Sequence, residues 1–222
     1  MNPYRLLSAL LAYPSDDLQQ AISQEIIPAL PAEDPFGASL MPLLDYLTQT
    51  DLIQAQENYV VTFDRTPSHS LHLFEHLHGE NRDRGQAMVN LLQEYQAQGF
   101  EPIGYELPDY LPLFLEFLSL QENEKAAELL GEAIHVVAYI GGNLRKSESA
   151  YAPIFDLLIA LSPVEPQELK VVPVRDMDEA LEMFGPGADG VEPLLKPGLG
   201  NGLHVLNFYS KAASTNSAGE KR

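Results

Sequence analysis

The sequence contains no cysteine, which excludes disulfide bonds, thiolate metal sites and cysteine-based catalysis. It is also poor in basic residues: 13 lysines and arginines stand against 32 aspartates and glutamates, a formal net charge of −19. Because nucleic acids and anionic membrane surfaces are bound through Lys and Arg, this balance disfavours both as partners. It favours a basic partner segment, since opposite charge speeds capture.

Long hydrophobic runs are also absent. No uninterrupted apolar stretch approaches the ~18–20 residues needed to span a bilayer. Segment 1–17, MNPYRLLSALLAYPSDD, lacks the basic opening of a secretory signal and soon reaches proline and acidic residues. We therefore expect a soluble, cytoplasmic protein with no direct membrane insertion.

The common catalytic motifs are missing as well. The sequence has no phosphate-binding GxxxxGK[ST], no GxGxxG after a strand and no GxSxG. Carboxylate pairs carry little information in so acidic a chain. We expect that the protein is not an enzyme.

What remains is the pattern of an all-α protein. The 222 residues, 45% of them hydrophobic, suffice for a sizeable core. Helical periodicity dominates, strand alternation is nearly missing and repeats are absent, which predicts a single-domain helical bundle. We expect the helical domain over 1–162 and a proline- and glycine-rich extension over 163–208, with one short helix over 176–184. Residues 209–222 are small and polar, and we expect them to be disordered.

Three local features give specific predictions. The β-branched run 59–63 has strand propensity, but we prefer a helix because the preceding LIQAQEN continues into it. Pro42 is expected to interrupt a helix over 40–47. Asn123 is expected to cap a helix, and the dipeptide at 141–142, Gly-Gly, is expected to end it.

One stretch, residues 59–92, concentrates ionisable side chains. Its charged and titratable residues are His69, His72, His76, His78, Arg65, Arg82, Arg84, Asp64, Glu75, Glu80 and Asp83. It holds four of the six histidines, although basic residues are sparse elsewhere. We expect a short helical turn over 71–77, ended by Gly79.

Three interpretations of this stretch are open. In the first, a helix places His72 and His76 on one face as metal ligands. The zinc-protease motif, however, needs a glutamate directly after the first histidine, and Leu73 stands there, so we expect no metal site. In the second, the stretch is a structural turn whose histidines are satisfied by nearby carboxylates. In the third, it forms a recognition surface around an apolar groove that binds a partner peptide.

A family resemblance favours the third interpretation. The run FDR…SLHLFEHLHGENRDRGQAMVNLL, followed by ELPDYLPL at 106–113, resembles the NarJ-type chaperones of respiratory nitrate reductase. These belong to the TorD/DmsD family of redox-enzyme maturation proteins. The resemblance covers roughly residues 4–140 and is loose after about Pro163. Tyr110 stands where the family pattern has a histidine, which keeps an aromatic ring but loses its titrating nitrogens.

The resemblance implies an all-α chaperone without a cofactor of its own. It implies binding to the N-terminal, twin-arginine-like segment of the nitrate reductase catalytic (alpha) subunit. The subunit would be held in the cytoplasm for insertion of the molybdenum cofactor and the iron–sulfur cluster, before membrane attachment. Alternatives are a chaperone for another molybdoenzyme or a histidine-dependent metalloenzyme. We expect mostly monomer with a minor dimer, since an exposed apolar groove favours self-association.

Candidate peptide-binding residues come from the same blocks. They are Phe63, Asp64, His72, Phe74, Glu75, His76, Leu77, Asp83, Arg84, Asp109 and Leu111. The apolar members would anchor the peptide, and carboxylates at the rim, Asp109 included, would meet its basic residues. The histidines would make affinity dependent on pH. Core packing explains each anchor equally well, and intramolecular pairing explains the charged residues equally well.

Overall fold

The computed structural model describes residues 2–31, 33–78 and 82–169. Every regular element in these ranges is helical, which confirms the all-α prediction. The elements are α1 (Pro3–Leu10), α2 (Asp16–Ala21), the π-helix η1 (Ile22–Ile26), α3 (Ile27–Ala29), α4 (Pro35–Gln49), α5 (Leu52–Tyr59), the π-helix η2 (Val60–Asp64), the 3₁₀-helix η3 (Pro67–His69), α6 (Glu75–His78), α7 (Arg82–Ala97), α8 (Leu111–Ser119), α9 (Asn123–Lys146) and α10 (Ala152–Leu161). Gly79, the expected helix over 176–184 and the expected disordered tail lie outside the described residues.

Side-chain caps explain where several helices begin. Asn2, Ser15, Asp34 and Asp51 each accept a backbone N–H from the first turn of the helix that follows. These bonds satisfy donors that the helix cannot satisfy itself. The caps therefore fix the starts of α1, α2, α4 and α5.

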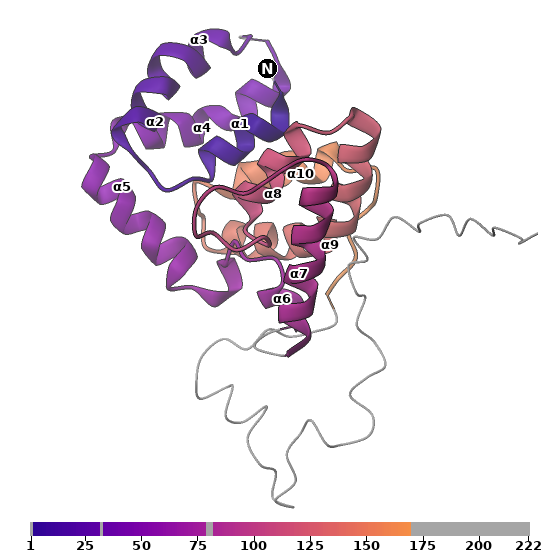
Figure 1. Cartoon of the computed structure of the whole chain (residues 1–222). Helices are drawn as coiled ribbons and strands as arrows, with labels where there is room; N and C mark the ends of the chain where they lie inside the picture. Colours follow the sequence, from indigo (N-terminus) through magenta and orange to yellow (C-terminus); the bar gives the residue numbers. More distant parts are fainter. Residues whose placement is uncertain (1, 32, 79–81, 170–222) are drawn as a thin grey trace, which may run out of the picture.

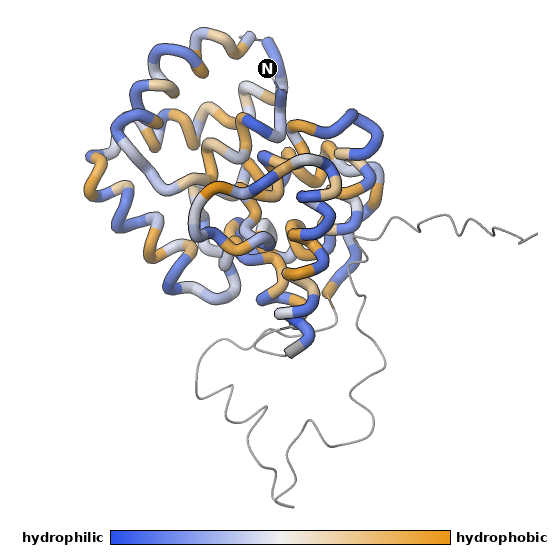
Figure 2. The backbone as a smooth tube through the Cα atoms, in the orientation of Figure 1, coloured by the Kyte–Doolittle hydropathy of each residue, from blue (hydrophilic) through white to orange (hydrophobic). Residues whose placement is uncertain are grey.

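The core forms where α8, α9 and α10 meet α1 and α4. Helix α9 packs along α10 and against α8, while α8 also packs on α1. Figure 1 shows α1–α5 on the upper left, α8–α10 toward the centre and right, and α6 and α7 at the lower centre. Hydrophobic and hydrophilic positions alternate along the helices at helical spacing (Figure 2), as expected when each helix buries one face. No helix within the described ranges has the length and apolar character needed to cross a bilayer.

Glu122 is the N-cap residue of helix α9, so Asn123 is its first residue and not its cap, contrary to prediction. The helix continues through Gly141 and Gly142, so the prediction that these glycines end it is also wrong. A β-carbon at Gly141 would stand 2.6 Å from the Cβ of Phe155 in α10. The glycine therefore serves close helix–helix approach rather than termination. A β-carbon at Gly142 would meet nothing within 4 Å.

Two further local predictions have different outcomes. Helix α4 passes through Pro42 without interruption, contrary to expectation. Four buried leucines on one face of α4 hold it against the core in spite of the lost backbone bond: Leu40, Leu43, Leu44 and Leu47. The run 59–63 is helical, which confirms the preference for helix over strand. It ends in the π turn η2, where the Arg65 N–H donates to the Val60 carbonyl at 3.0 Å.

Candidate functional site

Two segments far apart in the sequence cross at the candidate site. The Leu73 N–H donates to the Asp109 carbonyl at 3.0 Å, and the Leu111 N–H donates to the Leu71 carbonyl at 2.8 Å. Together with an isolated antiparallel bridge between His72 and Tyr110, these bonds hold residues 71–74 out of helical geometry. Helix α6 therefore begins only at Glu75, and the expected helical turn over 71–77 is wrong in its first half.

The same crossing separates the two histidines that a helix would have aligned. His72 lies in the bridge and His76 in α6, so they do not share a helical face. Among the residues that the structure describes, no three His, Asp or Glu side chains gather as a metal site. The geometry thus removes the pattern on which the metal interpretation depended.

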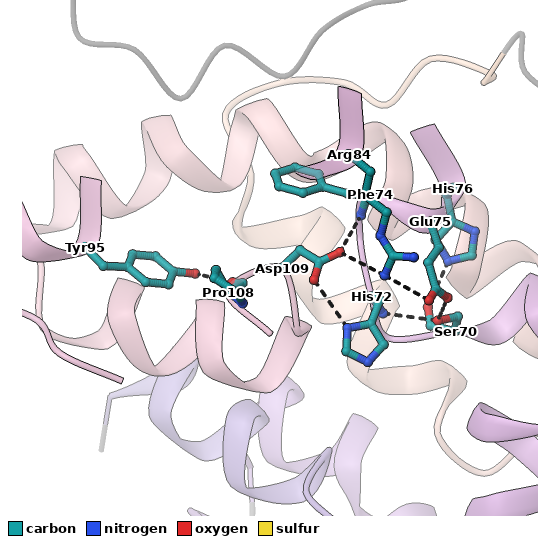
Figure 3. A network of polar contacts seen from close by, with 9 residues as sticks. All are labelled: Ser70, His72, Phe74, Glu75, His76, Arg84, Tyr95, Pro108 and Asp109. Carbon is teal, nitrogen blue, oxygen red and sulfur yellow. Dashed lines mark hydrogen bonds and ion pairs between the residues drawn. The ribbon is translucent and has the colours of Figure 1, made fainter. Parts of the chain in front are cut away.

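Asp109 is the centre of the crossing (Figure 3). Its carboxylate is fully buried and accepts the Phe74 N–H at 3.1 Å and a bond from His72 Nδ1 at 3.3 Å. Arg84 Nη2 lies 3.9 Å from Asp109 Oδ2, the oxygen that also accepts the Phe74 N–H. A buried carboxylate is stable only with such donors and cations around it. The expectation that Asp109 lies at a solvent-exposed rim is therefore wrong.

A second carboxylate extends this network toward the surface. Glu75, which begins α6, pairs with Arg84 of α7 at 3.0 Å and accepts the Ser70 hydroxyl. Ser70 Oγ in turn accepts the His72 N–H at 3.2 Å. Figure 3 shows these side chains converging from α6, α7 and the loop before α6. Arg84 therefore bridges a buried and a partly exposed carboxylate.

The two histidines have pKa values shifted in opposite directions. Burial lowers the pKa of His72, but the hydrogen bond and charge of Asp109 outweigh it, so the net pKa is raised. His76 is buried, and burial holds its pKa below the usual value, although its Nε2–H donates to the Ser70 carbonyl at 2.8 Å. At neutral pH the two rings therefore differ in their tendency to carry a proton.

Beside the crossing lies a pocket of ≈ 510 Å³, here called the aromatic pocket. Its lining residues are Tyr13, Tyr59, Phe63, Asp64, Pro67, Ser70, Leu71, His72, Glu75, Glu106 and Tyr110. Four Tyr and Phe rings, one imidazole and three carboxylates thus line one hollow, with no lysine or arginine in the lining. This chemistry suits a guest that carries apolar groups and positive charge.

Tyrosine hydroxyls fix the aromatic side of the pocket. Tyr59 donates its hydroxyl to the Leu11 carbonyl at 2.8 Å, so Tyr110 donates to the Tyr59 oxygen at 3.0 Å. The rings of Tyr59 and Phe63 lie 4.8 Å apart, and those of Tyr59 and Tyr13 lie 5.4 Å apart. The pocket wall is therefore a connected set of rings.

The structure divides the predicted site residues into three groups. Four of them line the aromatic pocket: Phe63, Asp64, His72 and Glu75. Five are buried and do not line it: Phe74, His76, Leu77, Asp109 and Leu111. On α7, Asp83 is exposed and Arg84 is part-buried in the network. Contact of any of these residues with a peptide stays a prediction.

The sequence interpretation did not include Tyr13, Tyr59, Glu106 and Tyr110 among the site residues. Tyr59 lies four positions before Phe63, so helical spacing could have placed it on the same face. Tyr13 is remote in sequence from the other lining residues, and no local pattern links it to them.

Comparison with known proteins first defines the fold. A solved structure from Archaeoglobus fulgidus, described as a candidate redox enzyme maturation protein, superposes with a TM-score of 0.53. The match covers 71% of this chain and 91% of that chain at 21% identity. The chain therefore shares this all-α fold.

Sequence comparison then defines the family. The model "Nitrate reductase delta subunit" matches residues 31–156. The chain is 42% identical over 163 residues to "Nitrate reductase molybdenum cofactor assembly chaperone NarJ" of Escherichia coli K12, covering 71% of this chain and 68% of that protein. It is 36% identical over 162 residues to "Probable nitrate reductase molybdenum cofactor assembly chaperone NarW" of the same organism, covering 73% and 68%. The chain belongs to the nitrate reductase delta subunit family, which confirms the NarJ-type resemblance.

Proposed function

We propose that the protein is a chaperone for molybdenum cofactor assembly in a nitrate reductase. The observation that carries the proposal is the family match over residues 31–156, together with relatives that bear this function in their names. The protein would act in the cytoplasm as a binding partner, not as an enzyme, and without a cofactor of its own. The absence of a three-residue metal cluster in the described part of the chain removes one feature of the metalloenzyme alternative.

The partner segment we propose is the N-terminal, twin-arginine-like part of the nitrate reductase alpha subunit. Such a segment carries positive charge beside apolar residues. The aromatic pocket offers rings for the apolar part and Asp64, Glu75 and Glu106 for the charge. The protein's net charge of −19 would speed the encounter. We expect a one-to-one complex with a monomer.

The pocket-lining members of the predicted site are proposed to touch the peptide directly. Phe63 is a buried lining residue and would contact apolar groups, while Asp64 is an exposed lining residue and would meet positive charge. His72 and Glu75 belong both to the polar network around Asp109 and to the pocket lining, and they would contact the peptide there. The five buried residues and Arg84 would hold these groups in place.

Exposed apolar residues extend the proposed surface beyond the pocket. Ile103 and Tyr105 are fully exposed, on either side of Gly104. Ile103 and Glu106 also line a smaller hollow of ≈ 230 Å³ that shares Tyr110 and Glu106 with the aromatic pocket. Exposed apolar side chains next to a pocket are typical of protein interaction sites. They would cover the part of the peptide that the pocket does not enclose.

Calorimetric titration with a synthetic peptide of the alpha-subunit N-terminus tests this proposal. We expect one-to-one binding, weakened about two- to fivefold by Asp64→Asn at low salt and less so at high salt. Glu25→Gln is the matched control, because it removes the same charge from an exposed position outside the pocket.

Three results would count against the proposal. Equal weakening by both variants would show only the effect of net charge. Tighter binding of another molybdoenzyme's N-terminal peptide would favour that enzyme as the client in place of nitrate reductase. Stoichiometric zinc or iron that survives dialysis would favour the metalloenzyme alternative.

A further inference from the structure

A second pocket lies on the first half of α9, and the proposed function does not use it. Glu124, Glu128 and Glu132 recur every four residues and so share one face of the helix. With Ala127, Gly131, Pro163 and Val164 they line a hollow of ≈ 550 Å³, here called the α9 pocket. It shares no lining residue with the aromatic pocket.

The two pockets lie near opposite ends of α9. Near the C-terminal end of α9, Asn143 Nδ2 donates to the Ser68 carbonyl at 3.3 Å, and Ser68 follows Pro67 of the aromatic pocket. Glu132 stands eleven residues earlier, which is about 16 Å along the helix axis. A ligand in one pocket would therefore leave the other free.

The wall of the α9 pocket is built by the segment that follows α10. Gly131 permits this segment to approach, because a β-carbon there would stand 2.9 Å from Val164 Cγ2. Three residues further on, the Gln167 N–H donates to His135 Nδ1 at 2.9 Å. Val164 is nevertheless 41% exposed. The segment is thus held on α9 at two points and presents an apolar surface to solvent.

Glu132 has an unusual environment in this pocket. Its Oε2 is buried and has no hydrogen-bond partner within the described part of the chain. Burial raises the pKa of Glu132 to about 7; Lys125 opposes the shift, and Glu128 and Glu94 add to it. Lys125 pairs instead with Glu128 at 3.1 Å. A buried carboxyl oxygen without a donor is costly, and a cationic donor would relieve that cost.

The charged groups around Glu132 are mostly of its own sign. Lys125 and Glu128 on α9 and Glu94 on α7 act on it directly, and Glu124 lines the same pocket. The segment that covers the pocket adds two exposed carboxylates, Glu165 and Glu168. Six positions therefore supply five carboxylates and one cation, and that cation is already paired. A second copy of a chain with net charge −19 is a poor occupant of such a surface.

We propose that the α9 pocket is an interaction surface for a lysine or arginine side chain of a partner protein. The aliphatic stem would lie on Ala127, Gly131 and Val164, as the stems of long basic side chains do on apolar surface. The charged head would meet Glu132, with Glu124 and Glu128 beside it. The proposal is independent of the client peptide in the aromatic pocket and gives the protein a second, simultaneous contact.

Proton linkage gives this surface a distinctive signature. A bound cation favours the ionised carboxylate, so only the deprotonated fraction of Glu132 is competent to bind. With a pKa of about 7 in the free protein, that fraction rises about tenfold between pH 6 and pH 8. Affinity should rise with it and level off above pH 8.

The test uses the full-length protein and two short synthetic peptides, one with a lysine between valines and one with norleucine in its place. We expect the lysine peptide alone to shift the amide NMR signals of Gly131, Glu132 and Val164 in a saturable way. Its affinity should rise about tenfold from pH 6 to pH 8. Glu132→Gln should remove that rise, whereas Glu57→Gln, an exposed change on α5, should keep it.

Several outcomes would overturn the proposal. Equal shifts with both peptides, or an unchanged pH dependence in Glu132→Gln, would remove the role of the carboxylate. Shifts confined to the aromatic pocket would place the cation there. Carbodiimide crosslinking of the free protein that joins Glu132 to a lysine in 170–222 would make the chain's own C-terminal segment the occupant. Thermal melting of each variant shows whether it is folded.

Discussion

The α9–α10 interface and the crossing at Asp109 are both buried, but different interactions hold them. At the interface, Gly141 lets Phe155 approach, and apolar side chains from both helices share the contact. At the crossing, one carboxylate receives a backbone N–H, a histidine and an arginine. An apolar interface spreads its free energy over many small contacts, whereas the crossing concentrates it at Asp109. The two regions should therefore respond differently to single substitutions.

The largest effect is expected at Asp109. Asp109→Ala leaves Arg84, His72 and the Phe74 N–H without their buried acceptor, which should lower the free energy of unfolding by about 3–5 kcal/mol. Asp109→Asn keeps one acceptor oxygen and should cost less. Urea unfolding measures both. A loss below about 1 kcal/mol for the alanine variant would show that water replaces the carboxylate and that the crossing does not depend on it.

The adjacent glycines of α9 provide the second test. Gly141→Ala places a methyl group against Phe155 and should lower the free energy of unfolding by about 1–3 kcal/mol through overpacking. Gly142→Ala is its matched control, because the added methyl meets nothing and the helix gains about 0.5–1 kcal/mol. Thermal melting should give shifts of opposite sign. Shifts of the same sign would mean that helix propensity, not packing, governs this part of α9.

The smallest effect is a dependence on pH. The raised pKa of His72 adds stability that is present below pH 6.5 and is lost as the pH rises through its folded value. The lowered pKa of His76 acts oppositely: its contribution is present above pH 6.5 and is lost as the pH falls. His72→Gln should therefore destabilise more at pH 5.5 than at pH 8. NMR titration should find His72 protonating at a higher pH than His76; the reverse order would contradict the assignment of Asp109 as its partner.

Much of the fold could be predicted from the sequence because apolar periodicity is local. The spacing of Leu111, Phe114, Leu115 and Leu118 predicts α8, and each of these residues is buried. The same reasoning failed at Gly141, where only the position of Phe155 in the folded protein explains the residue. It also failed for residues 71–74, because their backbone groups bond to residues 109 and 111, more than thirty positions away.

The candidate site was less predictable for a related reason. The histidine-rich stretch and the Pro-Asp block could be identified as unusual, and the structure brings them together. Which side chains face solvent could not be read from them: Asp109 is buried, whereas Asp64 is exposed. Tyr13 reaches the pocket only through the packing of α1 and the turn after it. The sequence alone identified the segments that form the site, and the tertiary structure shows which of their side chains are exposed.

The π turn at Val60–Asp64 has a consequence for the register of the chain. In an unbroken α-helix every fourth residue rotates about 40° around the axis, so Phe63 would lie about 80° past Ala55. The π turn has more residues per turn, so each residue rotates through a smaller angle. Ala55, Tyr59 and Phe63, all buried, therefore lie closer to one line along the helix. The helical run 52–64, formed by α5 and the π turn η2, thus holds one residue more in its last turn than an α-helical turn would. Deleting a single residue there would rotate the following side chains around the helix axis, including that of Asp64, which lines the aromatic pocket.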